Sequence, residues 1–212
     1  MTVYQHLEVS ESEGVVLVRL NRPAERNALN RALMTELTDF AREVRSRADV
    51  RAVVLSGAKG FFSAGADLAE RSIDPERRPS MLELRGAMLI GPDMCKAWED
   101  IEPVTLVAVE GYCVGGACAL SLCCDFRIMG EGGMMRLPEV PLGMNMSWRS
   151  LPRLATLVGP SRAKRFTLFG DANHHATSYM DRDQFLLTLN SRDLQEGIKS
   201  FFEKRKPRFE GD

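Results

Sequence analysis

The chain has 212 residues, 44% of them hydrophobic and 27% charged, as is typical of a globular domain with a buried core. Basic residues number 28 and acidic residues 29, which argues against a nucleic-acid-binding protein, since that class needs a basic excess or stripe. No apolar stretch approaches the roughly 20 residues of a membrane helix. Residues 1–10 lack the pattern of a secretory signal, so the expected location is cytoplasmic and no membrane partner is expected.

The first predicted elements alternate between strand and helix. Residues 14–20 are β-rich and predict a strand. Apolar residues recur at helical spacing after Asn30, which predicts a helix that Asn30 can cap. These residues are Leu33, Leu37, Phe40, Ala41 and Val44. A short apolar strand at residues 51–55 then leads into a glycine-rich segment at residues 56–67.

The middle of the chain continues the alternation. Residues 81–101 predict a helix that Gly91-Pro92 breaks or kinks. Residues 104–109 predict a strand that is apolar on both faces and therefore buried. A glycine-bearing turn at residues 111–116 leads into a short helix at residues 117–122.

A strand at residues 125–129 follows, and the chain from Trp148 onward is mostly helical. Its last helix, around residues 194–204, is expected to be solvated. Strands that alternate with helices and glycine turns are typical of an α/β fold.

The five cysteines favour buried, reduced thiols over disulfides or a metal site, because their number is odd and no C-x-x-C pair occurs. They are Cys95, Cys113, Cys118, Cys123 and Cys124. Cys123 and Cys124 are adjacent, and a strand would point them to opposite faces. The histidines, His6, His174 and His175, show no ligand spacing either, so no metal is expected.

Two glycine turns are the candidate functional elements. Residues 61–68 and residues 111–118 each follow a predicted buried strand, and their small side chains let backbone or ligand approach closely. Two strand-to-helix turns side by side present N–H groups at helix N-termini, where negative charge is favoured. Such a pair suits an enolate or tetrahedral oxyanion. Taken singly, each turn is also explained as a structural corner.

Four segments resemble, in order, the signature segments of the crotonase (enoyl-CoA hydratase/isomerase) superfamily. They are residues 27–30, 63–68, 111–116 and 138–143. The likeness runs from about Val15 to Asp171, and residues 192–206 resemble the last helix of the family. The resemblance implies a crotonase (ClpP-like) α/β fold, a spiral of ββα units with a helical C-terminal section.

The resemblance also implies a core domain at residues 1–171 and a shortened C-terminal helical segment at residues 172–212. Members of the family carry further elements between the segments that meet here at Asp171 and Ala172. A natural short variant, a degenerate gene and a stretch left out of the sequence all explain the difference.

In this family two peptide N–H groups hold the thioester carbonyl oxygen, and by position they belong to Ala66 and Gly116. Glu139 matches the second catalytic glutamate of the family, although a surface role at a strand end is an alternative. Other residues match positions that contact the substrate or coenzyme A: Asn27, Ala28, Leu29, Ala64, Asp67, Leu68, Gly115, Phe185 and Lys204. Of these, Phe185 and Lys204 match contacts to the adenine and the 3′-phosphate. The basic run at residues 204–208 agrees with a phosphate partner, and it is equally explained as a solvated charged end.

Ala119 stands where the hydratases of the family carry their first catalytic glutamate. Hydration in the hydratase manner uses two carboxylates, whereas migration of a double bond needs one group that takes and returns a proton. The sequence therefore favours an enoyl-CoA isomerase over a hydratase. An acyl-CoA-binding or assembly protein without turnover and an acyl-CoA thioesterase are alternatives. A Ser-His-Asp hydrolase is disfavoured because no G-x-S-x-G motif is present.

The expected partner is an acyl-CoA thioester, with coenzyme A as part of the substrate and no other cofactor. The resemblance implies a homotrimer or a homohexamer, stabilised largely by the C-terminal helices. Met144, Met146 and Trp148 either line a different acyl pocket or belong to the core.

Overall fold

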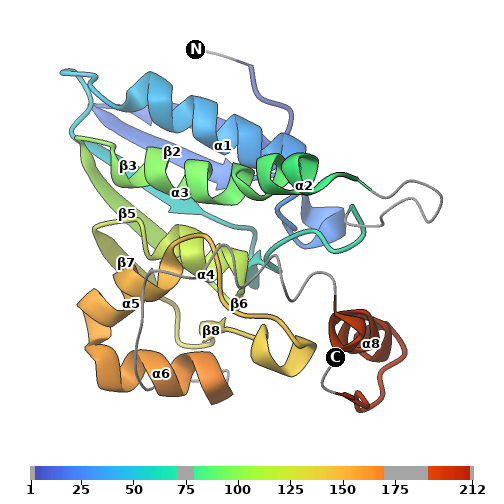
Figure 1. Ribbon diagram of the computed structural model, residues 1–212. Coiled ribbons are helices and arrows are strands. Elements are labelled where there is room, and N and C mark those ends of the chain that lie inside the picture. Colours follow the sequence, from blue (N-terminus) through green and yellow to red (C-terminus); the bar gives the residue numbers. More distant parts are fainter. Residues whose placement is uncertain (1–2, 71–78, 170–190, 211–212) are drawn as a thin grey trace. The chain divides into compact units, whose positions relative to one another are not determined.

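The computed structural model of the protein describes residues 3–70, 79–169 and 191–210 (Figure 1). The chain forms two compact units, Met1–Met135 and Arg136–Asp212. The domain boundary expected at residues 171–172 lies outside the described residues and stays a prediction.

The first unit is built on a five-stranded sheet in the order β1-β2-β3-β5-β7. The strands are Leu7–Ser12 (β1), Val15–Leu20 (β2), Ala52–Ser56 (β3), Val104–Val109 (β5) and Phe126–Met129 (β7). β1 and β2 are antiparallel, and every other neighbouring pair is parallel. Four of these strands were predicted, and β1 was not. The prediction that β5 is buried on both faces is wrong, because buried positions alternate along it with accessible ones and Val104 is 45% exposed.

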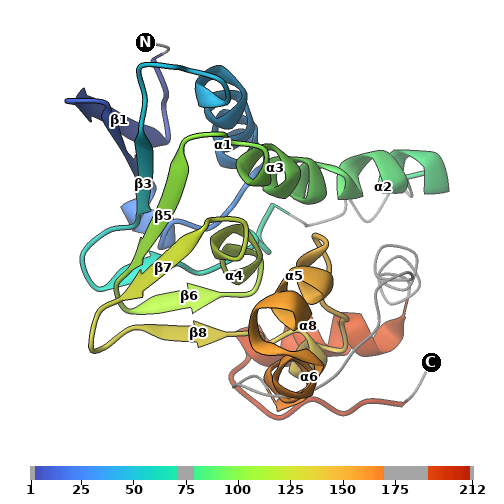
Figure 2. The same ribbon diagram turned by 90° about the vertical axis from the view of Figure 1, so that its left-hand side faces the viewer.

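Two helices, α1 (Arg31–Val44) and α3 (Ile90–Glu99), pack side by side on one face of this sheet (Figure 2). The predicted cap is confirmed, since the side chain of Asn30 accepts a hydrogen bond of 2.9 Å from the Leu33 amide. The five apolar residues predicted for this helix are buried. Trp98 of α3 donates from Nε1 to the Leu37 carbonyl oxygen at 3.0 Å, which joins the two helices inside the core.

The predicted helix at residues 81–101 is two helices, α2 (Met81–Met88) and α3. The break lies at Leu89 and not at Gly91-Pro92 as predicted. Pro92 falls in the first turn of α3, where the missing N–H has no intrahelical partner to lose. Proline therefore marks the start of the second helix and does not end the first.

A second sheet of three short strands has the order β4-β6-β8, formed by Phe61–Ser63 (β4), Tyr112–Val114 (β6) and Met134–Arg136 (β8). β4 and β6 run parallel. The short helix α4 (Gly116–Ser121) follows β6 directly and begins one residue earlier than predicted.

The prediction of buried, reduced cysteines is confirmed, because all five are buried and none is in a disulfide. Cys123 and Cys124 lie in a turn after α4, so the expectation of opposite faces of a strand is wrong. Burial raises the pKa of the Cys124 thiol well above its usual range.

The second unit is helical, as predicted. It contains the 3-10 turn η2 (Val140–Leu142) and the helices α5 (Ser150–Val158), α6 (Pro160–Phe169) and α8 (Arg192–Phe202). The last helix is amphipathic and not simply solvated, because Leu194, Gly197 and Ser200 are buried. In the described part of the chain, no helix is both long enough and apolar enough to cross a bilayer.

Candidate active site

The two glycine turns of the sequence lie next to each other in the first unit. Each follows a strand of the small sheet, and the register pairs Phe61 with Tyr112 and Ser63 with Cys113. Because neighbouring parallel strands end at the same edge of a sheet, residues 64–68 (the Ala66 loop) and Gly115-Gly116 leave that edge together.

Gly65 is in direct contact with the start of α4. A Cβ atom built on Gly65 would lie 2.4 Å from the Val114 carbonyl oxygen and 3.4 Å from the Gly116 nitrogen. The Ala66 nitrogen is bonded to the carbonyl carbon of Gly65, so the Ala66 and Gly116 amides are no more than about 7 Å apart. Only glycine permits this approach, and its φ of 86° is also in the left-handed region.

The Ala66 N–H group is directed away from the backbone that holds its loop. The Gly65 carbonyl oxygen accepts from the Leu29 amide at 2.7 Å, and the Asp67 amide donates to the Leu29 carbonyl oxygen at 3.1 Å. These two bonds make a parallel bridge between Leu29 and Ala66. In a trans peptide the N–H points opposite to the C=O, so the Ala66 N–H faces away from Leu29.

The Gly116 N–H group points out of the helix start for the same geometric reason. The Gly115 carbonyl oxygen accepts from the Ala119 amide at 3.1 Å, along the axis of α4. The amide of the same peptide, at Gly116, therefore points back past the N-terminus of the helix. Among the described residues, neither the Ala66 nor the Gly116 amide donates to another backbone group. Two such donors, fixed close together, can hold one anionic oxygen.

The expectation of two helix N-termini is half wrong. Gly116 is the first residue of α4, but Ala66 is followed by a turn at residues 68–70. The Ala66 amide is oriented by the bridge to Leu29 and not by a helix.

Asn27 and Ser63 anchor the strand that leads into the Ala66 loop. Asn27 is fully buried, and its side chain accepts from the Arg22 amide at 2.8 Å and donates to the Phe62 carbonyl oxygen at 3.0 Å. The Ser63 hydroxyl, also fully buried, donates to the Asn27 carbonyl oxygen at 2.7 Å and accepts from the Gly65 amide at 3.1 Å. The side chain of Asn27 is thus engaged in the fold itself.

An ion pair joins the Ala66 loop to the segment around Ala28. Arg22 Nη1 lies 3.2 Å from Asp67 Oδ2, and both side chains are only 13% exposed. The same nitrogen donates to the Ala28 carbonyl oxygen. Leu29 is 1% exposed, so the part of residues 27–29 that can meet a ligand is the partly accessible Ala28.

The remaining predicted residues of the first unit lie in the same two turns. Ala64 is exposed and donates from its amide to the Arg26 carbonyl oxygen at 3.0 Å. Leu68 is partly exposed in the turn after Asp67. Gly115 is buried and has φ 53° and ψ -116°. Ala119 is fully buried inside α4.

Glu139 lies in the second unit, immediately before η2. Its carbonyl oxygen accepts from the amides of Leu142 at 3.0 Å and Met144 at 2.8 Å, which fixes the turn. The residue is half-buried, and its side-chain oxygen Oε2 is buried. The structure therefore does not place Glu139 at the surface with a fully solvated carboxylate.

Helix α8 packs on the turn that follows Glu139. A Cβ on Gly143 would lie 3.2 Å from the Asp193 carbonyl oxygen, and one on Gly197 would lie 2.5 Å from the Leu142 carbonyl oxygen. Backbone meets backbone at both glycines, so α8 supports the segment that begins with Glu139. Met144, Met146 and Trp148 are buried, which places them in the core.

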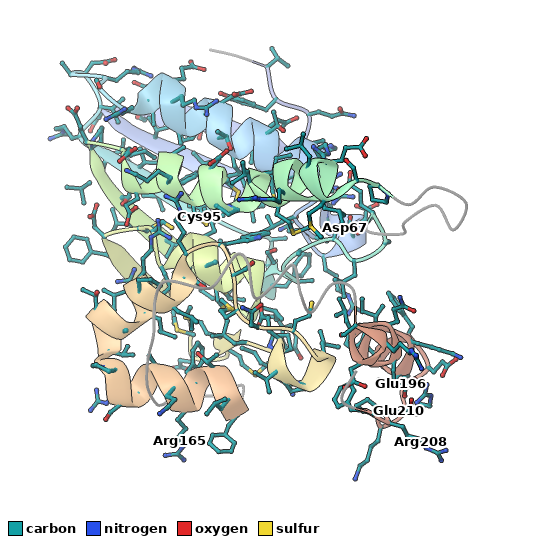
Figure 3. The ribbon with its side chains drawn as sticks, viewed as in Figure 1. Asp67, Cys95, Arg165, Glu196, Arg208 and Glu210 are labelled. Carbon is teal, nitrogen blue, oxygen red and sulfur yellow. The ribbon has the colours of Figure 1, made fainter. Side chains whose placement is uncertain are left out.

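The basic run at residues 204–208 folds back on α8. Arg205 donates from Nη2 to Glu196 Oε2 at 2.8 Å, and the Arg208 amide donates to Glu196 Oε1 at 2.8 Å. The Arg205 guanidinium lowers the pKa of the Glu196 carboxyl to about 2. Figure 3 shows Glu196, Arg208 and Glu210 gathered at α8 and the residues after it. Lys204 is exposed, and Phe185 lies outside the described residues.

Comparison with known proteins identifies the family. A family model described as enoyl-CoA hydratase/isomerase matches residues 10–177. The chain belongs to this family. Crotonyl-CoA hydratase of Syntrophomonas wolfei is 31% identical over 169 residues, which are 79% of this chain and 63% of that protein. The 2,3-dehydroadipyl-CoA hydratase of Escherichia coli K12 is 33% identical over 166 residues, which are 78% of this chain and 62% of that protein. The chain thus spans less than two thirds of the length of these curated relatives.

Solved structures confirm the crotonase fold. An enoyl-CoA hydratase from Mycobacterium avium subsp. paratuberculosis K-10 superposes with a TM-score of 0.81 at 19% identity, covering 98% of this chain and 99% of that one. An enoyl-CoA hydratase/isomerase from Xanthobacter autotrophicus Py2 gives 0.71 at 30% identity, covering 82% and 63%. The α/β fold with a helical C-terminal section, expected from the resemblance, is therefore correct.

Two residues of the site were missed in the sequence. Arg22 and Ser63 hold the Ala66 loop. Ser63 lies within the predicted turn at residues 61–68, but no spacing in the sequence links either residue to its partners. Their partners lie 45 residues away for the Arg22–Asp67 pair and 36 for Ser63–Asn27, so only the folded chain reveals them.

Proposed function

We propose that this protein is an acyl-CoA enzyme that stabilises a thioester enolate with the N–H groups of Ala66 and Gly116. The contact of Gly65 with the start of α4 carries the proposal, since it brings the two outward-directed amides together. An enolate oxygen gains more from two fixed donors than the neutral carbonyl does, which lowers the barrier to proton removal. The names of the family and of the similar hydratases support a coenzyme A thioester as substrate.

Glu139 is proposed as the group that moves the proton. A carboxylate held by a fixed turn and partly withdrawn from solvent suits general acid–base work. Asn27, Ala28, Leu29, Ala64, Asp67, Leu68, Gly115, Phe185 and Lys204 are proposed to contact the substrate or coenzyme A, or to shape the backbone that does.

Double-bond migration is the proposed reaction. Ala119 supplies only a methyl group, fully buried in α4, at the position of the first glutamate of the hydratases. One carboxylate can remove a proton from one carbon of the enoyl chain and return it to another. The curated relatives are named hydratases, so hydration is the reaction that the test must exclude.

A second candidate is an acyl-CoA-binding or assembly protein without turnover. It is favoured by Ala119, because a methyl group stands where the hydratases of the family carry their first catalytic glutamate. For the enzyme, we further propose that coenzyme A enters as part of the substrate and that no other cofactor is used. We also propose a homotrimer or a homohexamer and a cytoplasmic location. Sedimentation of the purified protein tests the assembly.

The deciding experiment is incubation of the protein with 2-enoyl-CoA and 3-enoyl-CoA of several chain lengths. Isomerisation leaves the mass of the thioester unchanged and moves the double bond, hydration adds one water, and thioester hydrolysis releases a thiol. Mass spectrometry with product identification separates the three reactions. Binding of the thioester with none of them supports the second candidate.

The role of Glu139 is tested with Glu139→Gln, which keeps the shape and removes the charge. We expect a loss of about 10²- to 10⁴-fold in kcat with unchanged affinity for coenzyme A. Glu131→Gln, in an exposed turn, is the matched control and should keep full activity. Full turnover by Glu139→Gln would assign the proton transfer to another group.

A further inference from the structure

Arg22 holds two separate segments of the candidate site through one nitrogen atom. Its Nη1 donates to the Ala28 carbonyl oxygen and to Asp67 Oδ2, and its backbone amide donates to the buried side chain of Asn27. We propose that Arg22 is a positioning residue, which sets the Ala66 amide and couples it to the coenzyme A segment at Ala28. This inference rests on the proposed function and adds a residue to it.

The connection from Arg22 to the Ala66 amide runs through Asp67. One carboxylate oxygen of Asp67 pairs with Arg22, and the other accepts from the Ala69 amide at 3.1 Å and the Glu70 amide at 3.4 Å. The Asp67 amide donates to the Leu29 carbonyl oxygen. Both carboxylate oxygens and the amide of Asp67 are therefore held by hydrogen bonds, and Ala66 is the residue directly before it.

The other side of the Ala66 peptide is fixed by the hydrogen bond from the Leu29 amide to the Gly65 carbonyl oxygen, 2.7 Å long. Leu29 is itself one residue from Ala28, whose carbonyl oxygen Arg22 holds. Arg22 thus contacts both strands of the bridge between Leu29 and Ala66, one at Ala28 and the other at Asp67. A shift of either strand would rotate the Ala66 peptide.

The physical properties of the pair suit this role. Both side chains are 13% exposed, so water and salt screen the attraction less than at an open surface. Removing the guanidinium would leave a half-buried carboxylate without its cation, and the loop would relax to solvate it. An oxyanion donor acts through preorganisation, so a small displacement of the amide lowers the rate without abolishing substrate binding.

The test uses Arg22→Met, Asp67→Asn and the double variant in the full chain. Asp67→Asn breaks only the link to the Ala66 loop, whereas Arg22→Met also frees the Ala28 carbonyl. We expect kcat to fall about 10-fold in Asp67→Asn and about 10- to 100-fold in Arg22→Met. The double variant should be no slower than Arg22→Met, because both changes break one connection.

Free coenzyme A separates the two links, since it has no thioester carbonyl and does not use the oxyanion donors. Its dissociation constant, measured by calorimetry, should rise more in Arg22→Met, which also frees the Ala28 carbonyl, than in Asp67→Asn. Arg22→Lys should recover part of the lost kcat, because one ammonium group can donate to both acceptors.

Hydrogen exchange of the amides in residues 64–68 tests the inference without turnover. Exchange should be faster in Arg22→Met and Asp67→Asn, and near wild type in Arg22→Lys. If the wild-type protein proves inactive, the proposed function fails while this measurement still decides the role of Arg22. Wild-type exchange in Arg22→Met, or a loss of melting temperature with kcat unchanged, would overturn the inference.

Discussion

The two turns of the candidate site orient their amides by different means. In the Ala66 loop, the backbone bridge to Leu29 directs the amide, and the side chains of Arg22, Asp67 and Ser63 hold the two segments that form this bridge. In the turn at Gly115-Gly116, the geometry follows mainly from the backbone, through the φ of 53° at Gly115 and the start of α4, and the Cys118 thiol adds a bond to the Cys113 carbonyl oxygen across the turn. One amide is held by a polar network and the other by a conformation that favours glycine.

This difference predicts two kinds of sensitivity. A substitution in a polar network removes only some of its hydrogen bonds, so each single substitution should displace the Ala66 amide partially. A backbone turn permits or forbids a conformation, so substitutions in it should act sharply or hardly at all. The contact of Gly65 with Val114 and Gly116 belongs to both turns, and its loss should have the largest effect.

Gly65→Ala should separate the two turns. The new Cβ would lie 2.4 Å from the Val114 carbonyl oxygen, a backbone atom that cannot give way cheaply. Because this clash adds to the strain of an alanine at φ 86°, we expect the free energy of unfolding to fall by about 3 kcal/mol or more. Urea denaturation measures this loss, and any folded fraction should have lost its turnover.

Gly60→Ala is the matched control for that change. Gly60 has nearly the same φ, 85°, but nothing lies within 4 Å of its built Cβ. It should cost only the conformational strain, about 1 kcal/mol. Equal losses at both positions would mean that the contact between the turns does not constrain the site.

Gly116→Pro removes the second N–H donor while keeping the turn. Proline is tolerated at the first position of a helix, and Gly115 is outside the α region that a residue before proline avoids. We expect kcat to fall about 10²- to 10³-fold, the usual cost of one oxyanion donor. Gly116→Ala keeps the N–H and should retain most of the activity. Steady-state kinetics of the two variants measure the difference.

The circular dichroism spectra and melting temperatures of both Gly116 variants must match the wild type for this comparison to hold. If Gly116→Ala lost as much kcat as Gly116→Pro, the effect would come from the side chain, and the N–H would have no special part in it.

The large elements of the fold could be predicted from the sequence, because each carries its own periodicity. The helix after Asn30 has a cap and five apolar residues at helical spacing, and all of these positions behave as expected. β4 and β6 could not be predicted in this way, since each has three residues, too few to show an alternating pattern. Their pairing is nevertheless what brings the two glycine turns together.

The glycine turns of the candidate site could be predicted from the sequence, whereas the side chains that support the Ala66 loop could not. Gly65 and Gly115 are visible as turns, because their positive φ values favour glycine. The direction of the Ala66 amide was attributed to a helix, but it follows from the bridge to Leu29, 37 positions earlier in the chain. Contacts between residues so far apart leave no local signal in one sequence.

Ser63→Ala tests the polar network at its most buried member, and here the expected effect is the smallest. The substitution removes the donor to the Asn27 carbonyl oxygen and the acceptor of the Gly65 amide, both in a fully buried site. We expect a loss of about 1–2 kcal/mol in unfolding free energy and a modest fall in kcat, because the Gly65 amide no longer has its acceptor. Ser121→Ala is the control: its hydroxyl is equally buried but donates to the Cys118 carbonyl oxygen within its own helix. If denaturant unfolding gave Ser121→Ala the larger loss, the Ala66 loop would be held by its backbone, as the turn at Gly116 is, and the distinction between the two turns would fail.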